Sequence, residues 1–216
     1  MTFLNAREGL NKIKNAEILG FIVGVIGIIT AVIAVVTAIN IKNGKAVRSS
    51  GYVGVGLLAL IISVLGIIAF ILNLIGLSKA SKDEPCFNKA LTVTIVGIVL
   101  GVFNAVFSAN PVSKGIFDAL QSAVSIVIVN FVLRGIMNIA AKLDEEEMIQ
   151  KGKIMLKLLV GIRIAALVLN LVFSFLQVDS NISLVVLILL LVVACITSAA
   201  EFIYVKYLIS AVEMVQ

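Results

Sequence analysis

The fold is decided by residues 18–41, ILGFIVGVIGIITAVIAVVTAINI, which contain no charged side chain. A helix needs about 20 consecutive apolar residues to cross the hydrocarbon core of a bilayer. Further uncharged runs follow at 51–78, 90–113, 119–133, 164–178 and 182–200. These runs do not alternate between apolar and polar residues, as the strands of a membrane barrel would. The sequence therefore predicts an all-α, polytopic integral membrane protein.

The composition of the whole chain agrees with this prediction. Of its 216 residues, 61% are hydrophobic and 13% are charged, and the mean hydropathy is +1.19. A soluble domain is closer to half apolar and a quarter charged. A water-facing globule of this length could not hide such an excess of apolar side chains, so the composition excludes a soluble protein.

The fourth and fifth uncharged runs are too short to cross a bilayer unless each span includes an arginine. The fourth run reaches full length by continuing through Arg134, and the fifth by starting early enough to include Arg163. Two re-entrant segments would instead leave backbone amides without partners in lipid. We therefore expect one membrane domain over residues 1–216 with six transmembrane helices, at about 17–40, 52–77, 90–110, 117–141, 155–177 and 182–208.

Lysine and arginine are distributed unequally between the connections. If the N-terminus is inside the cell, eleven of these residues lie on the cytoplasmic side and four lie outside, with Arg134 and Arg163 inside spans. Basic residues favour the cytoplasmic side of a membrane. We therefore expect a multi-pass protein of the cell membrane with both termini in the cytoplasm.

The residues before the first span have the pattern of an amphipathic helix. Phe3, Ala6, Leu10 and Ile13 recur at helical spacing, and basic residues lie off that face. Such a helix lies in the membrane interface, with its basic face toward anionic headgroups. We expect residues 1–15 to form an interfacial helix of this kind.

Several function classes are disfavoured by the composition. The chain has no histidine, which is the commonest metal ligand and general base. Its two cysteines, Cys86 and Cys195, lie far apart in the expected topology. We expect no catalytic residues, no metal site and no cofactor, and an enzyme is the weakest of the hypotheses. The net charge of +5 comes from residues at the ends of apolar runs, which indicates contact with the phospholipid bilayer and not with nucleic acid.

The odd-numbered spans share an entry pattern of a lysine followed by small residues. The spacing of eight and then four residues occurs in Lys12, Gly20 and Gly24, in Lys89, Gly97 and Gly101, and in Lys153, Gly161 and Ala165. Small residues four apart let another helix backbone approach closely. The pattern predicts helix packing at these glycines and three helical-hairpin repeats. Coincidence is an equal alternative, because glycine is common in membrane helices.

Charged and polar side chains gather in the second half of the chain. Arg134, Arg163 and Glu201 are expected at one depth, where Glu201 would bridge one or both guanidinium groups. The remaining positive charge predicts a site for an anionic or polar solute, or for a lipid headgroup. The other expected lining residues are Asn130, Asn138, Asn170 and Ser198. The alternative is that both arginines extend toward the inner phosphates and bind nothing else.

Two functions follow from these patterns. The first is a small transport-type protein with a binding site among the fourth, fifth and sixth spans, because charged residues inside spans usually mark solute pathways. The second is a non-catalytic scaffold or accessory subunit that acts through helix-helix and protein-protein contacts. The substrate and the coupling ion stay open, as does the choice between a homo-oligomer and assembly with a partner membrane subunit.

Overall fold

The structure, a computed structural model, describes residues 3–42, 49–107, 111–175 and 183–215, except for some side chains near the ends of helices. Within these residues helices are the only regular secondary structure, joined by short turns. The helices are α1 (Leu4–Lys42), α2 (Ser49–Ala80), α3 (Pro85–Phe107), α4 (Pro111–Lys142), α5 (Glu146–Phe175) and α6 (Ser183–Met214). Pro85 and Pro111 begin α3 and α4, where a missing N–H leaves no hydrogen bond unmade. The expected all-α fold class is confirmed.

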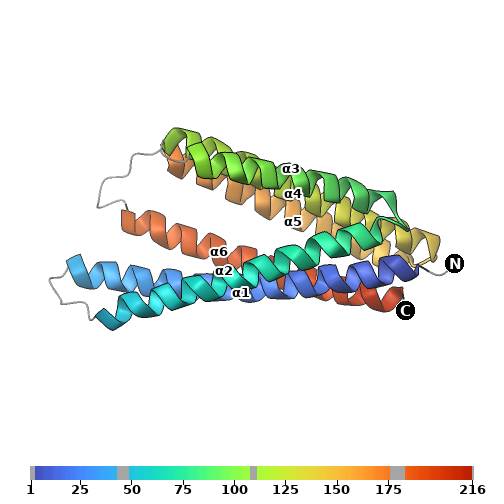
Figure 1. Cartoon of the computed structure of the whole chain (residues 1–216), viewed down its shortest axis with the longest axis horizontal. Coiled ribbons are helices and arrows are strands. Elements are labelled where there is room, and N and C mark those ends of the chain that lie inside the picture. Colours follow the sequence, from blue (N-terminus) through green and yellow to red (C-terminus); the bar gives the residue numbers. More distant parts are fainter. Residues whose placement is uncertain (1–2, 43–48, 108–110, 176–182, 216) are drawn as a thin grey trace.

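The six helices form a ring in which each helix contacts the next, and α6 contacts α1. The contacts are sparsest between α2 and α3 and between α5 and α6. These two seams divide the ring into a first group, α1, α2 and α6, and a second group, α3, α4 and α5. The groups diverge toward one end, and both chain termini lie at the opposite end (Figure 1). We call the end with the termini the terminal end.

Five helices contain stretches long and apolar enough to span a membrane. They are Leu4–Ile33, Gly56–Ala80, Pro85–Phe107, Gly115–Lys142 and Leu191–Met214. The described part of α5 is not among them, because its first half carries several charged side chains. Five such helices are compatible with a multi-pass membrane protein. The sixth crossing and the side of the membrane on which the termini lie stay predictions.

The buried core lies at the terminal end. The largest fully buried side chains include Leu10, Leu77, Leu133, Tyr204 and Leu208, which come from helices of both groups. Farther along the bundle, large apolar side chains face outward, as at 62% exposed Leu60 and 67% exposed Val106. Such exposure would destabilise a protein in water, whereas acyl chains can cover these side chains in a bilayer. Among the described side chains, the core therefore joins the two groups at the terminal end.

The first turns of α1 pack against the end of α2. Residues 4–15 continue directly into the first apolar run, and Ala6, Leu10 and Ile13 are buried. A Cβ atom on Gly9 would lie 2.6 Å from Gly76 O and 2.6 Å from Ala80 N, so two backbones meet here. The apolar face that predicted an interfacial helix thus contacts another helix, and an interfacial position for residues 1–15 stays a prediction.

The expected hairpins appear unequally in the structure. The α1–α2 and α3–α4 pairs pack extensively, whereas α5 packs mainly on α4 and α6 mainly on α1. The chain order of the helices is that of three hairpins, but their packing follows the two groups. A three-hairpin repeat stays a prediction.

The crossing of α1 and α2 gives a test of this packing. Gly76→Ala should lower the free energy of unfolding by roughly 1–3 kcal/mol. The added Cβ would lie 2.8 Å from Gly9 O and 2.9 Å from Ile13 N, and neither backbone atom can move freely. Detergent-solubilised protein unfolded with increasing sodium dodecyl sulfate, followed by circular dichroism, would measure the change.

Gly66→Ala on the same helix is the matched control. A Cβ atom there meets nothing within 4 Å, and alanine is the better helix former, so this variant should be as stable as the parent or slightly more. Equal stability of the Gly66 and Gly76 variants would contradict the close approach of the α1 and α2 backbones at Gly76.

Candidate functional site

Two adjoining cavities lie between the two helix groups. One, of about 440 Å³, is lined by residues of α1, α2, α3, α4 and α5, and we call it the central cavity. The other, of about 470 Å³, is lined by α4, α5 and α6, and we call it the lateral cavity. Gln121, Ser125 and Arg163 line both, so the two form one polar region.

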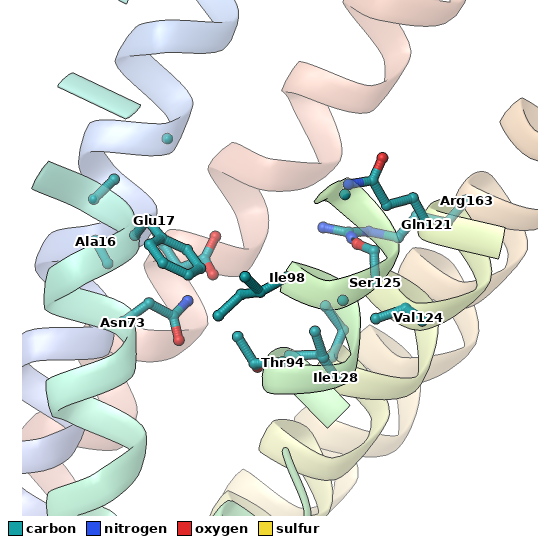
Figure 2. Close-up of a pocket in the computed structure, with 16 residues that line it drawn as sticks. Ala16, Glu17, Asn73, Thr94, Ile98, Gln121, Val124, Ser125, Ile128 and Arg163 are labelled. Atoms are coloured by element: carbon teal, nitrogen blue, oxygen red, sulfur yellow. The ribbon is translucent and has the colours of Figure 1, made fainter. Parts of the chain in front are cut away.

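Charged side chains enter this region from both groups. Glu17 of α1 lines the central cavity, and Glu201 of α6 lines the lateral cavity. Arg163 of α5 lines both cavities and donates a hydrogen bond from Nη1 to Ser125 Oγ. Figure 2 shows Glu17 on one side of the central cavity and Arg163, Gln121 and Ser125 on the other.

The two carboxylates interact with Arg163 through space. Glu17 lies within electrostatic range of both Arg163 and Glu201. Among the side chains described, neither carboxylate forms an ion pair with the guanidinium within 4.0 Å. The charges are therefore close enough to stabilise one another and far enough apart to leave space for a bound molecule or water.

Of the residues expected to form the site, Arg163, Glu201 and Ser198 lie at or beside the cavities. A Cβ atom on Gly24 of α1 would lie 3.5 Å from Glu201 Oε2 and 3.6 Å from Ser198 Oγ. Gly24 of α1 therefore faces the polar side of α6, at a distance that an added Cβ could occupy in ordinary van der Waals contact. The side chain of Asn170, which is in α5, lies outside the described residues.

The remaining expected residues lie elsewhere on α4. Arg134 is exposed, lines neither cavity, and is within electrostatic range of Cys86 at the start of α3. Nine residues at about 100° each place Arg134 opposite Ser125 on the helix. Asn138 donates a hydrogen bond to Glu84 Oε1 at 2.9 Å, and the buried Asn130 Oδ1 has no described partner. The structure thus brings Glu201 near Arg163 but not near Arg134.

The predicted packing glycines have different surroundings. A Cβ atom on Gly97 would lie 3.0 Å from Val124 Cγ1, and one on Gly101 would lie 3.0 Å from Gln121 Nε2. These two positions bring α3 close to α4 beside the central cavity. Cβ atoms on Gly20 and Gly161 would meet nothing within 4 Å, and Gly20 lines the central cavity.

Sequence reasoning missed Glu17 and the polar side chains that α2 and α3 contribute. Glu17 immediately precedes the first uncharged run, where a charged residue is an ordinary helix-end residue and gives no sign of a site. Asn73 and Thr94 gave no signal, since single polar residues in spans commonly serve packing.

The terminal end is closed by the connection between α2 and α3. Asp83 Oδ2 accepts a hydrogen bond from Ala6 N at 2.7 Å, near the start of α1. The adjacent Glu84 is 4% exposed, and its Oε2 atom accepts a hydrogen bond from Lys142 Nζ at 2.7 Å, at the end of α4. We call Asp83 and Glu84 the strap, because they tie the first helix group to the second.

Two effects act on the pKa of the Glu84 carboxyl. Burial raises it, while the hydrogen bonds from Lys142 and Asn138 and the charge of Lys142 together lower it by more. The pKa therefore lies below its ordinary value, and the carboxylate is ionised at neutral pH.

At the seam between α5 and α6, Tyr207 Oη of α6 lies 3.5 Å from Met148 O of α5.

Comparison with known proteins gives no relative. The chain matches no family model, and neither the curated proteins nor the solved structures contain a similar one. The class that the structure defines is therefore an all-helical chain with five apolar helices compatible with multiple membrane crossings. Function has to be argued from the polar region between the two helix groups.

The strap predicts a defined dependence of stability on pH. Because the pKa of Glu84 is lower in the folded protein than in the unfolded chain, its contribution is present above the unfolded value. That contribution is lost as the pH falls from the unfolded value through the lower, folded value. Glu84→Gln should lower the free energy of unfolding at pH 7 by roughly 1–3 kcal/mol. Unfolding midpoints measured in detergent at pH 7 and at acidic pH would show both effects.

Glu147→Gln is the control for this variant. Glu147 also pairs with a lysine, Lys151, at 2.6 Å, but both side chains are exposed. Exposed pairs contribute little to stability, so this variant should unfold like the parent. Equal effects of the two substitutions would show that Glu84 does not hold the groups together.

Proposed function

We propose that the protein is a transport-type membrane protein that binds a polar solute between its two helix groups. The observation that carries the proposal is the position of Arg163, which reaches Ser125 in the region that the two cavities share. Glu17 and Glu201 reach the same region from the other group. Three ionisable side chains thus converge between helices that are otherwise mainly apolar.

The energetics of charge in a bilayer support this proposal. An ionised side chain near the bilayer centre costs a few kcal/mol on insertion scales unless it is paired or hydrated. Charges used only for packing would be expected to form direct ion pairs, whereas these side chains surround open space. Inward-facing charges of this kind commonly mark solute pathways.

The packing of the two groups suggests how access to the cavities could change from one side of the membrane to the other. The groups diverge at the end away from the termini, and the core and the strap close the terminal end (Figure 1). With both termini in the cytoplasm, the end at which the groups diverge would face the outside. Movement of the groups against each other along their sparse seams would expose the cavities to the other side, as in alternating access.

The charge of the cavities changes what solute we propose. An anionic solute or a lipid headgroup was expected because two arginines would leave a positive excess. Arg134 lines neither cavity, and the described lining carries three carboxylates, Glu17, Asp118 and Glu201, against the Arg163 guanidinium. We therefore propose that the solute is polar, without the preference for an anion that two arginines would give.

Cysteine labelling tests the proposal in a background with Cys86→Ala and Cys195→Ala. Gly20→Cys places a thiol in the central cavity, where a new Cβ meets nothing within 4 Å. A membrane-impermeant maleimide applied outside intact cells should label this thiol. A cysteine at Ile67, which is 60% exposed on the apolar surface, should remain unlabelled as the control.

Inside-out vesicles test the closure of the terminal end. Labelling of Gly20→Cys from the cytoplasmic side should be slow and should increase severalfold when Glu84→Gln weakens the strap. The scaffold alternative predicts that packed helices exclude the reagent from both sides. Absence of labelling in both preparations, with the protein folded by circular dichroism, would reject the transport-type proposal.

A further inference from the structure

The central cavity presents a hydrogen-bond acceptor that lacks a donor. Asn73 Oδ1 is buried and has no hydrogen-bond partner among the described residues, and Asn73 lines the cavity. A buried acceptor without a donor destabilises a protein by about 1–3 kcal/mol. Glu17, on the neighbouring helix, contributes two further acceptor oxygens (Figure 2). This side of the cavity therefore suits a molecule that brings N–H groups.

The charges around the cavities favour a positive molecule. Arg163 lies within electrostatic range of both Glu17 and Glu201, so two carboxyl groups lie near one guanidinium. Asp118 adds a third carboxyl group to the lining and accepts a hydrogen bond from Asn104 Nδ2 at 2.8 Å. A bound cation would stabilise the ionised form of these carboxyl groups, whereas an anion would destabilise it.

The rest of the lining favours an organic cation over a bare metal ion. Within the part of the chain that the structure describes, no three acidic or thiol side chains converge as a metal site would require. Beside Glu17 and Asn73 the central cavity is lined by apolar groups, among them Phe70, Ile98 and Ile128. An aromatic ring beside carboxylates is a frequent surrounding for alkylated ammonium groups.

From these observations we infer that the central cavity binds an organic cation with N–H donors, such as an alkylammonium ion. Glu17 and Asn73 would accept its hydrogen bonds, and the apolar lining would contact its carbon atoms. The inference deepens the proposed function, since it names the chemical class of the solute bound at the same site.

The first test measures the sign of the electrostatic potential in the cavity. Gly20→Cys, in the background without native cysteines, is reacted separately with cationic trimethylammonioethyl and anionic sulfonatoethyl methanethiosulfonate. Each rate is divided by the rate of the same reagent with free 2-mercaptoethanol. We expect the normalised rates to favour the cation by at least about tenfold. Glu17→Gln should remove most of this preference, and the distant Glu147→Gln should keep it.

The outcomes separate this inference from the proposed function. Equal normalised rates, or a preference for the anion, would overturn the cation inference and leave a water-accessible cavity in place. If neither reagent reacts, the cavity is inaccessible and the transport-type proposal itself fails.

The second test uses protection by small ions of matched size. Propylammonium should slow modification of Gly20→Cys by uncharged methyl methanethiosulfonate severalfold, and propionate at equal concentration and ionic strength should not. Tetramethylammonium, which lacks N–H donors, should protect less. Asn73→Leu keeps a similar volume and removes the acceptor, so it should weaken protection by propylammonium. Equal protection by propionate, or none by propylammonium, would overturn the inference.

Discussion

Apolar side chains gain little when they leave acyl chains for one another, so a helical bundle in lipid has to be held by close backbone approach and by polar contacts. Both occur at the terminal end of this protein. Gly9 and Gly76 bring α1 and α2 into backbone contact, and the strap residues Asp83 and Glu84 join α1 to α4. Among the described residues, the rest of the bundle has no comparable contact between the two groups, which diverge there (Figure 1).

The polar region depends on this arrangement. A carboxylate such as Glu17 could not be placed against acyl chains without protonation or a partner. Divergence of the groups above the packed end creates a space in which Glu17, Arg163 and Glu201 face one another without direct ion pairs. The same constraint thus accounts for the closed end, for the cavities and for the tolerated charges.

The strap and the central cavity involve the same two helices. The strap is the connection between α2 and α3, and these helices border one of the two sparse seams. Both also line the central cavity, through Asn73 of α2 and Thr94 of α3. The same two helices thus carry the strap at the terminal end and part of the wall of the central cavity.

The apolar runs alone were sufficient to predict the all-α fold class, because an uncharged segment of this length in a bilayer satisfies its backbone hydrogen bonds by forming a helix. They also predict a similar depth for Arg134, Arg163 and Glu201, since depth is estimated from position along a straight helix. Which side chains face each other was decided only by the tertiary structure. The rotation of α4 directs Ser125 into the cavity and Arg134 away from it, and Glu17 joins Arg163 because α1 and α5 lie on opposite sides of the same space. The rotation of each helix about its own axis, and the choice of the helices that pack beside it, depend on contacts between distant segments. A hydropathy pattern contains no information about these contacts.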